Sequence, residues 1–207
     1  MKQRSFYLTL WMLILCALAF TSCSDDDDDD VTVEEGIYVL NNGKMGNNNS
    51  TITYYDPVTQ ASDAADVYAA QNGKGLGDSG QDILCEGKYI YLAVYTSNRI
   101  SVMTRDFVEV TSIALLRDGQ PQSPRSLAYA GKKLYVSLYD GYVARINTSD
   151  FTVEAQVKVG RNPEGLAVSN GKLFVANSGG MDYNTPVGYD KTVSVINLKT
   201  VEVEKTI

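Results

Sequence analysis

The chain has 207 residues, with 18 Lys and Arg against 25 Asp and Glu, and a formal net charge of −7. This length is typical of one domain that buries its own core. The sequence contains no histidine, which excludes Ser-His-Asp and Cys-His catalysis, His-ligated zinc and haem held by a proximal histidine. Because the acidic balance is not interrupted by a basic stripe, nucleic acid is not an expected partner.

Residues 1–22 have the pattern of a targeting segment. Lys2 and Arg4 precede a mostly apolar run over residues 6–20, which is too short to span a bilayer comfortably. Small residues then lead to Cys23, and this order resembles a bacterial lipobox. The resemblance implies a lipoprotein signal peptide over residues 1–22, cleavage before Cys23 and lipidation of its sulfur. A plain secretory signal that is cut nearby is the alternative.

Residues 23–35 contain six consecutive aspartates directly after Ser24. Such a run repels itself and buries nothing, so we expect an extended acidic tether between the lipidated Cys23 and the fold. The letters CSDDDDDD also resemble the export signal that sends lipoproteins to the outer face of the outer membrane in Gram-negative gut anaerobes. The resemblance implies a lipid-anchored outer-membrane protein that faces the extracellular side.

From residue 36 onward the sequence consists of repeats. Three segments align through a Gly-Lys pair: ILCEGKYIYLAVYTSNRISVM, LAYAGKKLYVSLYDGYVARIN, and LAVSNGKLFVANSGG continued by KTVSVIN. The aromatic residue after each pair recurs at Tyr91, Tyr135 and Phe174, with spacings of 44 and 39 residues, and Tyr38 marks an earlier partial copy. Each unit divides into four short apolar strands separated by Gly, Asn, Asp and Pro. A period near forty with four strands predicts an all-β fold, a β-propeller of four-stranded antiparallel blades.

We expect the blades at about residues 36–80, 81–124, 125–163 and 164–207. The segments KLFVANSGG, TVSVINLKT and VEAQVKVGRNPEGLAVSNGK resemble the YVTN or YncE-like β-propeller family, whose repeat runs aromatic-Val-x-Asn, Val-x-Val-Ile-Asp and Val-Gly-x-x-Pro-x-Gly. The opening YVLNNGKMGNNNSTITYYDP looks like the first blade of surface lipoproteins of this family. The resemblance implies a propeller over residues 36–207.

The two ends of the repeat region predict an incomplete ring. The first unit begins at its second strand, and the last unit stops before the Val-Gly-x-x-Pro turn that the third unit completes. Fewer than four complete blades without a closing strand would leave open edges and an apolar blade face in water. We therefore expect an open arc of a larger ring, from a truncated gene model or a fragment.

One end of the blades carries the long loops. Alternate connections of an antiparallel meander meet at the same end of the sheet. The second-to-third and inter-blade connections are long and rich in Asn, Tyr and Gly, a composition that suits sugars, amide-bearing cofactors or peptide edges. We predict ligand contacts on this long-loop face from Asn41, Asn42, Asn48, Lys74, Tyr95, Arg125, Tyr139, Arg161, Asn177, Tyr183 and Tyr189.

Two further patterns do not predict a cofactor or metal site. Asp182, Asn184 and Asp190 offer oxygen ligands, but their spacing fits no known calcium loop. The segment GKGLGDSG over residues 73–80 lacks the order of a phosphate-binding loop, so we interpret it as a flexible connection within a loop over residues 68–80.

The leading hypothesis is a non-enzymatic surface module that holds a nutrient on the long-loop face and hands it to an outer-membrane transporter. Some similar surface propellers of gut anaerobes capture vitamin B12, so the resemblance implies cobalamin as one ligand, with a glycan as another. A protein-interaction scaffold at the outer membrane is the alternative. A carbohydrate- or lactone-acting hydrolase is less favoured because the sequence has no histidine.

Overall fold

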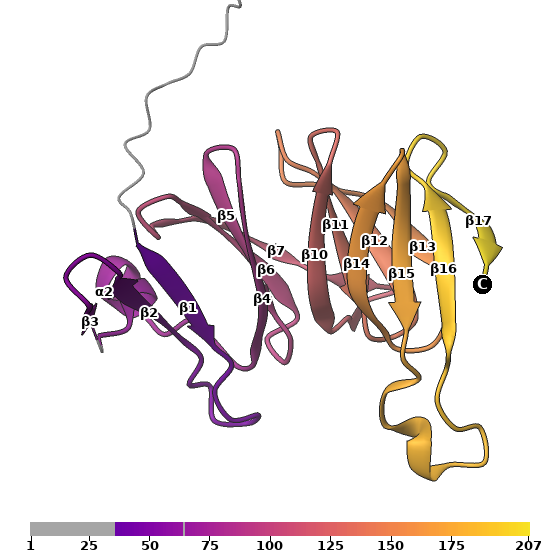
Figure 1. The fold of residues 1–207 in the computed structure, drawn as a ribbon, viewed down its shortest axis with the longest axis horizontal. Helices are drawn as coiled ribbons and strands as arrows, with labels where there is room; N and C mark the ends of the chain where they lie inside the picture. The colour runs from indigo at the N-terminus through magenta and orange to yellow at the C-terminus, as the bar shows by residue number, and fades with distance from the viewer. Residues whose placement is uncertain (1–35, 64) are drawn as a thin grey trace, which may run out of the picture. The chain divides into compact units, whose positions relative to one another are not determined.

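The computed structural model describes residues 36–63 and 65–207. These residues form one three-stranded sheet, three four-stranded sheets and a two-stranded hairpin (Figure 1). The signal peptide expected over residues 1–22, the lipidated Cys23 and the acidic tether to residue 35 lie outside the described residues. No helix of the described part has the length and hydropathy to cross a membrane.

The strands follow the chain in order. The first sheet comprises β1 (Ile37–Asn41), β2 (Thr51–Asp56) and β3 (Ala61–Asp63). The second comprises β4 (Gly80–Glu86), β5 (Tyr89–Val94), β6 (Arg99–Thr104) and β7 (Glu109–Ala114). The third comprises β10 (Pro124–Ala130), β11 (Lys133–Leu138), β12 (Tyr142–Asn147) and β13 (Val153–Lys158). The fourth comprises β14 (Pro163–Ser169), β15 (Lys172–Asn177), β16 (Thr192–Asn197) and β17 (Glu202–Thr206). The shorter elements are α2 (Val67–Asn72), β8 (Leu116–Arg117), β9 (Gln120–Pro121) and η1 (Gly180–Asn184).

The predicted fold class is confirmed. Every sheet is an antiparallel meander in which each strand pairs with its neighbour in sequence, as in a propeller blade. The first sheet has three strands because β1 carries Tyr38, which stands where Tyr91 stands in β5, and the described residues contain no counterpart of β4 before it. Within residues 36–63 and 65–207 the sheets do not close into a barrel.

The second sheet is covered on both faces. All residues of β5 from Ile90 to Val94 are at most 2% exposed, and successive strand residues point to opposite faces. Alternate side chains therefore enter two different cores. Those of Ile90, Leu92 and Val94 pack with Ile52, Tyr68 and Leu76 on the side of the first sheet. Those of Tyr91 and Ala93 pack with Leu127, Leu134 and Val136 of the third sheet.

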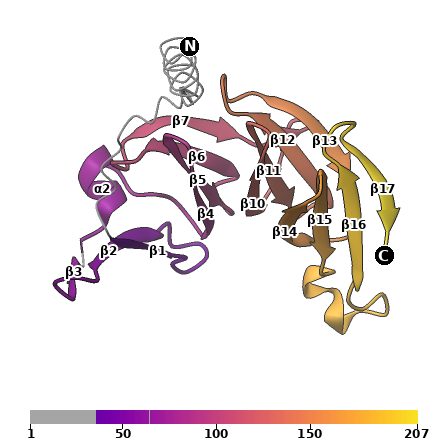
Figure 2. The ribbon, with the colours of Figure 1, turned by 45° about the horizontal axis from the view of Figure 1, so that its top comes forward.

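The third and fourth sheets meet in the same way. A further core joins Tyr135 and Val143 to Leu173, Val175 and Ile196. The sheets thus lie side by side in chain order within residues 36–207 (Figure 2). The cores between neighbouring sheets are closely packed, so the sheets are held rigidly against one another. The strand ends, and the loops that join them, therefore keep fixed relative positions.

The loop expected over residues 68–80 is partly helical, and this is a correction to the sequence prediction. Helix α2 begins after Asp66, whose carboxylate accepts the amide of Tyr68 at 3.1 Å, and it ends at Gly73 in the left-handed conformation. These are the preferred residues for starting and ending a helix. The helix places Tyr68 in a fully buried position against the second sheet, which anchors the segment by apolar burial.

Candidate functional site

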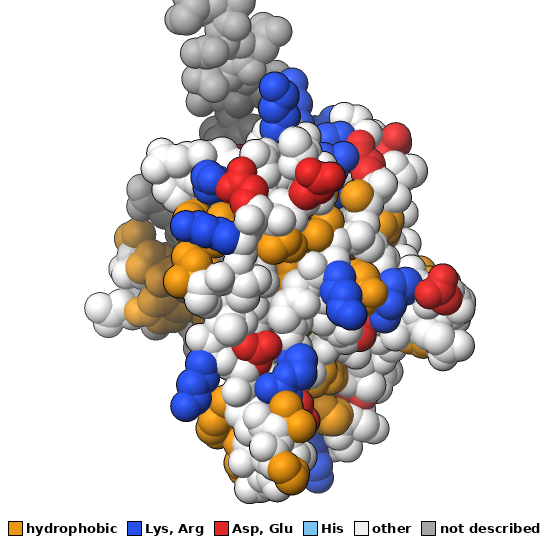
Figure 3. Space-filling model, turned by 90° about the vertical axis from the view of Figure 1, so that its right-hand side faces the viewer, with side chains coloured by type: hydrophobic (Ala, Val, Ile, Leu, Met, Phe, Trp, Pro, Cys, Tyr) orange, Lys and Arg blue, Asp and Glu red, His pale blue; other side chains and the backbone are white. Residues whose placement is uncertain are grey.

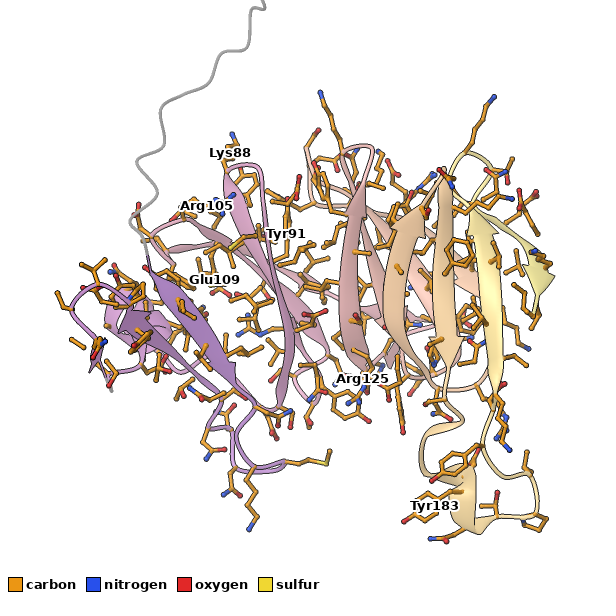
Figure 4. The ribbon with its side chains drawn as sticks, viewed as in Figure 1. Lys88, Tyr91, Arg105, Glu109, Arg125 and Tyr183 are labelled. Atoms are coloured by element: carbon orange, nitrogen blue, oxygen red, sulfur yellow. The ribbon has the colours of Figure 1, made fainter. Side chains whose placement is uncertain are left out.

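The long loops project from one end of the sheets. The connection between β1 and β2 and that between β15 and β16 both extend downward in Figure 1. Figure 4 shows Arg125 and Tyr183 at this lower end, whereas Lys88 lies at the opposite end, on the short turn between β4 and β5. The short turns and the long loops are thus separated, and the long-loop face is the surface on which the candidate site is built.

Three polar residues occupy the same position in three sheets. Gln81, Arg125 and Glu164 are each the second residue of the first strand of their sheet, in β4, β10 and β14. The Nη1 atom of Arg125 donates to Gln81 Oε1 at 2.6 Å. Its Nε and Nη2 atoms donate to the two carboxylate oxygens of Glu164 at 2.8 and 3.0 Å. This bidentate ion pair fixes the orientation of the guanidinium plane.

Two tyrosines flank the Arg125 guanidinium. Tyr95 and Tyr139 directly follow the second strands of their sheets, and their ring centroids lie 5.2 and 5.3 Å from Arg125 Cζ. The two rings meet edge to face, with centroids 5.7 Å apart. The two distances from Arg125 Cζ to the ring centroids are within the range of cation–π attraction. We call Gln81, Tyr95, Arg125, Tyr139 and Glu164 the Arg125 cluster.

Tyr139 remains protonated at neutral pH. Burial raises the pKa of its phenol above the ordinary value of 10.0, the neighbouring Tyr95 and Glu164 raise it further, and Arg125 opposes them. The hydroxyl therefore keeps its proton and has the chemical capacity to donate a hydrogen bond. The sequence predicted Tyr95, Arg125 and Tyr139 as separate ligand contacts, and the structure brings these three together.

A pocket of about 340 Å³ opens beside the Arg125 cluster. Its wall comes from the turn between β11 and β12, from the connection between β13 and β14, and from Asp190. The lining residues are Tyr139, Asp140, Gly141, Lys158, Val159, Gly160, Arg161, Asn162 and Asp190. Asn162, which the sequence analysis did not single out, donates from Nδ2 to the Tyr139 carbonyl at 3.0 Å. The sequence feature that could have indicated Asn162 as a site residue is its position before Pro163, in a segment that must turn.

Arg161 fastens the connection between β15 and β16, which spans residues 178–191. Its guanidinium forms an ion pair with Asp182 and donates to the Gly188 carbonyl at 2.9 Å. Its backbone amide donates to Asp190 at 2.9 Å. Asp182 and Asp190, which were considered as calcium ligands, thus accept hydrogen bonds from Arg161. The described residues contain no cluster of three metal-ligating side chains.

Two predicted contacts lie in this long loop. The rings of Tyr183 and Tyr189 stack with centroids 5.8 Å apart and an interplanar angle of 22°. Their exposed fractions are 47% and 58%, so the pair presents aromatic surface to solvent. Figure 4 shows Tyr183 at the far end of the loop.

The predicted asparagines play mainly local roles. Asn177 is 3% exposed, accepts the Gly160 amide at 3.1 Å and donates to the hydroxyls of Thr192 and Ser194. Asn41 stands at the equivalent end of β1 and donates in the same way to Thr51 and Thr53. Asn42 accepts the Ser50 hydroxyl at its carbonyl, and Asn48 adopts a left-handed turn with a φ of 51°. The side chains of Asn41 and Asn177 hold strand ends together.

Lys74 lies away from the Arg125 cluster. It forms an ion pair with Glu109 of β7, the last strand of the second sheet, whereas the cluster lies at the first strand. Glu109 is 9% exposed and also accepts hydrogen bonds from Arg99 at 2.7 Å and Ser101 at 2.6 Å. Burial alone would raise the pKa of Glu109, but these donors outweigh it and lower the pKa from 4.5 to about 2. Lys74 therefore belongs to a structural charge network.

The fold and this face define the protein as a β-propeller-type repeat protein. Its sequence matches the family described as a domain of unknown function (DUF5074) over residues 35–207, and the chain belongs to that family. No curated protein matches the sequence.

Solved propellers share the fold at low identity. The chain is similar to Kuenenia stuttgartiensis hydrazine synthase, with a TM-score of 0.59, 16% identity, and coverage of 75% of this chain and 42% of that one. It is similar to Saccharomyces cerevisiae Sqt1, with a TM-score of 0.58, 15% identity, and coverage of 84% and 48%. The WD40 β-propeller domain of Doa1 gives a TM-score of 0.51, 11% identity, and coverage of 65% and 42%. The chain thus spans less than half the length of these structures.

Proposed function

We propose that this protein is a non-enzymatic binding module that holds a small ligand on its long-loop face, over the Arg125 cluster and the adjoining pocket. The observation that carries the proposal is the convergence of Tyr95, Arg125 and Tyr139 from two neighbouring sheets beside an open pocket of about 340 Å³. Flat rings, a fixed guanidinium and a few polar groups around a concavity are typical of small-ligand sites.

The charges on this face favour binding over catalysis. Glu164 is held in a bidentate pair by Arg125, and Asp140 accepts hydrogen bonds from Arg117 and Gln122. Asp190 accepts from the Arg161 amide and from Thr192. A general base needs a carboxylate that can reach the substrate proton, and these three carboxylates are engaged by protein donors.

The ligand we propose to test first is a cobalamin-type nutrient. Its broad flat ring and peripheral amides suit contact with Tyr95, Tyr139 and the polar pocket rim. The likeness of the repeats to YncE-like surface propellers supports this choice. The lipobox-like residues before Cys23 and the acidic tract support a lipid anchor on the extracellular side of the outer membrane, with a transporter as a partner in uptake.

Calorimetric titration of cyanocobalamin into the full chain, purified in detergent, tests this proposal. We expect binding at micromolar or lower concentration, and we expect Tyr139→Ala and Tyr95→Ala each to weaken it about tenfold because each removes one aromatic contact. Tyr129→Ala, in the other half of β10 from Arg125, is the matched control and should bind as the wild type does. Absence of heat with folded protein would eliminate cobalamin, and full binding by both variants would eliminate the Arg125 cluster as its site.

A protein-interaction scaffold is the second candidate. Two apolar side chains in the long loops are largely exposed, Met45 at 63% and Val187 at 67%, and exposed apolar groups favour contact with a partner chain. Affinity capture from outer membranes with the full chain as bait distinguishes the two functions. A stoichiometric protein that is lost on Met45→Asp and Val187→Asp, without effect on small ligands, would favour the scaffold.

A further inference from the structure

The connection of residues 178–191 is held in one conformation at three points. Its two arms approach so closely that a Cβ on Gly179, which has a φ of 73°, would lie 2.3 Å from the Asp190 amide nitrogen. A Cβ on Gly180 would lie 2.2 Å from Tyr139 Oη, so the loop also packs against the Arg125 cluster. Arg161 binds both arms, through Asp182 on one and Gly188 on the other. These contacts fix the backbone that carries the exposed tyrosine pair.

The fixed backbone presents the near-parallel, uncharged rings of Tyr183 and Tyr189 to solvent. The rings stack on each other although both are about half exposed, and the loop forms the lower end of the molecule, where hydrophobic side chains are visible in Figure 3. The nearest acidic groups, Asp182 and Asp190, are engaged by Arg161. Because stacking has already restricted these side chains, a ligand that covers them would lose less conformational entropy on binding.

The surroundings of the rings are polar. Asp190, adjacent to Tyr189, also lines the pocket of about 340 Å³, together with Asn162 and Lys158. Within residues 36–63 and 65–207 the side chain of Lys158 forms no ion pair or hydrogen bond, so its ammonium is available as a donor. Aromatic faces next to hydrogen-bonding groups suit a ligand that is apolar on one face and polar at its edge. A pyranose ring has this distribution, since its C–H groups lie on the face and its hydroxyl groups at the rim.

We propose that Tyr183 and Tyr189 form a stacking platform for a neutral saccharide ring, with the pocket edge at Lys158 and Asn162 accommodating the next sugar. The C–H face of the sugar is polarised positively and is attracted to the negative face of the aromatic ring. The platform is a second subsite that goes beyond the binding proposed above for the Arg125 cluster. By themselves, the two rings and the neighbouring Val187 offer less area than the roughly 800 Å² per partner of a standard protein interface, whereas one aromatic face matches the size of a sugar ring.

Titration of the full chain with cellohexaose, maltohexaose, mannohexaose and xylohexaose tests the platform. We expect at least one of these neutral hexasaccharides to bind, observed by calorimetry and by saturation transfer from the protein to sugar protons in nuclear magnetic resonance. Tyr183→Ala and Tyr189→Ala should each weaken that binding by roughly three- to tenfold. Tyr183→Phe should retain it because the ring remains. Lys158→Met should weaken it by a smaller factor.

The controls separate the platform from folding and from the first proposal. Both tyrosines are exposed, so their alanine variants should unfold at the same temperature as the wild type, and Tyr129→Ala should bind sugar normally. Loss of cyanocobalamin binding together with retained sugar binding would refute the Arg125 proposal alone. Absence of binding by all four sugars, or unchanged affinity in both alanine variants, would overturn the platform whatever the result with cyanocobalamin.

Discussion

Replacing Glu109 with glutamine removes one negative charge from the network of Lys74, Arg99 and Ser101 and keeps the shape of the side chain. The native pKa of about 2 lies below the ordinary value of 4.5. Each unit of difference corresponds to about 1.4 kcal/mol, so the charged form stabilises the folded chain by about 3 kcal/mol at most. Lys74 is 56% exposed, and solvent screens its share, so we expect about 2 to 3 kcal/mol at pH 7.

The sign of the pH dependence follows from the lowered pKa. The stabilisation is complete above the unfolded pKa and is lost as the pH falls from about 5 toward 2, because the unfolded chain binds the proton first. The difference in unfolding free energy between wild type and Glu109→Gln should therefore decline to below about 1 kcal/mol at pH 2.

Urea unfolding of the full chain at several pH values, followed by tyrosine fluorescence and circular dichroism, measures this difference. Glu204→Gln is the matched control, since Glu204 is an exposed partner of Lys172 and should show a much weaker dependence. If wild type and Glu109→Gln lose stability in parallel between pH 7 and pH 2, the network does not stabilise the fold as described.

Three further substitutions test other parts of the structure. Gly180→Ala places a Cβ at a φ of 55° and against Tyr139, so it should lower the unfolding free energy by roughly 1 to 3 kcal/mol in urea titrations; wild-type stability would contradict this packing. Asn177→Ala leaves the Gly160 amide without its acceptor, which should cost about 1 to 3 kcal/mol and speed hydrogen exchange at that amide; unchanged exchange would argue against the bond. Leu134→Ala opens a cavity between the second and third sheets and should cost about 2 to 5 kcal/mol in the same titrations, whereas a loss below about 1 kcal/mol would show that this core is loosely packed.

The repeat and its turns were predictable from the sequence because they depend on local chemistry. Gly87, Gly131 and Gly171 precede lysines in the three aligned segments, and all have positive φ values between 56° and 71°. A tight turn between two apolar strands needs a residue that tolerates this conformation. Helix α2 was not predicted because residues 68–80 were interpreted as one loop from their glycine-rich part, although Asp66 and Gly73 are typical residues at a helix start and end.

The Arg125 cluster was only partly predictable. Tyr95, Arg125 and Tyr139 were predicted as ligand contacts on the long-loop face, but Gln81 and Glu164 were not. Three different residue types at one register position share no sequence pattern, and their contact depends on packing between sheets. Aligning the first strands of the repeats by register, rather than by residue type, would have brought these positions together.

Gln81, Arg125 and Glu164 share one register position, so a single repeated position supplies the polar groups of the Arg125 cluster from three sheets. Each residue belongs to a separate sheet, and each is held by strand pairing that continues on either side of it. A substitution at one of these positions also changes the hydrogen bonds of its neighbours, since Arg125 bonds to both Gln81 and Glu164, and it leaves the backbone ladder of its own sheet in place. The polar groups of the long-loop face can therefore change while the scaffold that presents them stays in place.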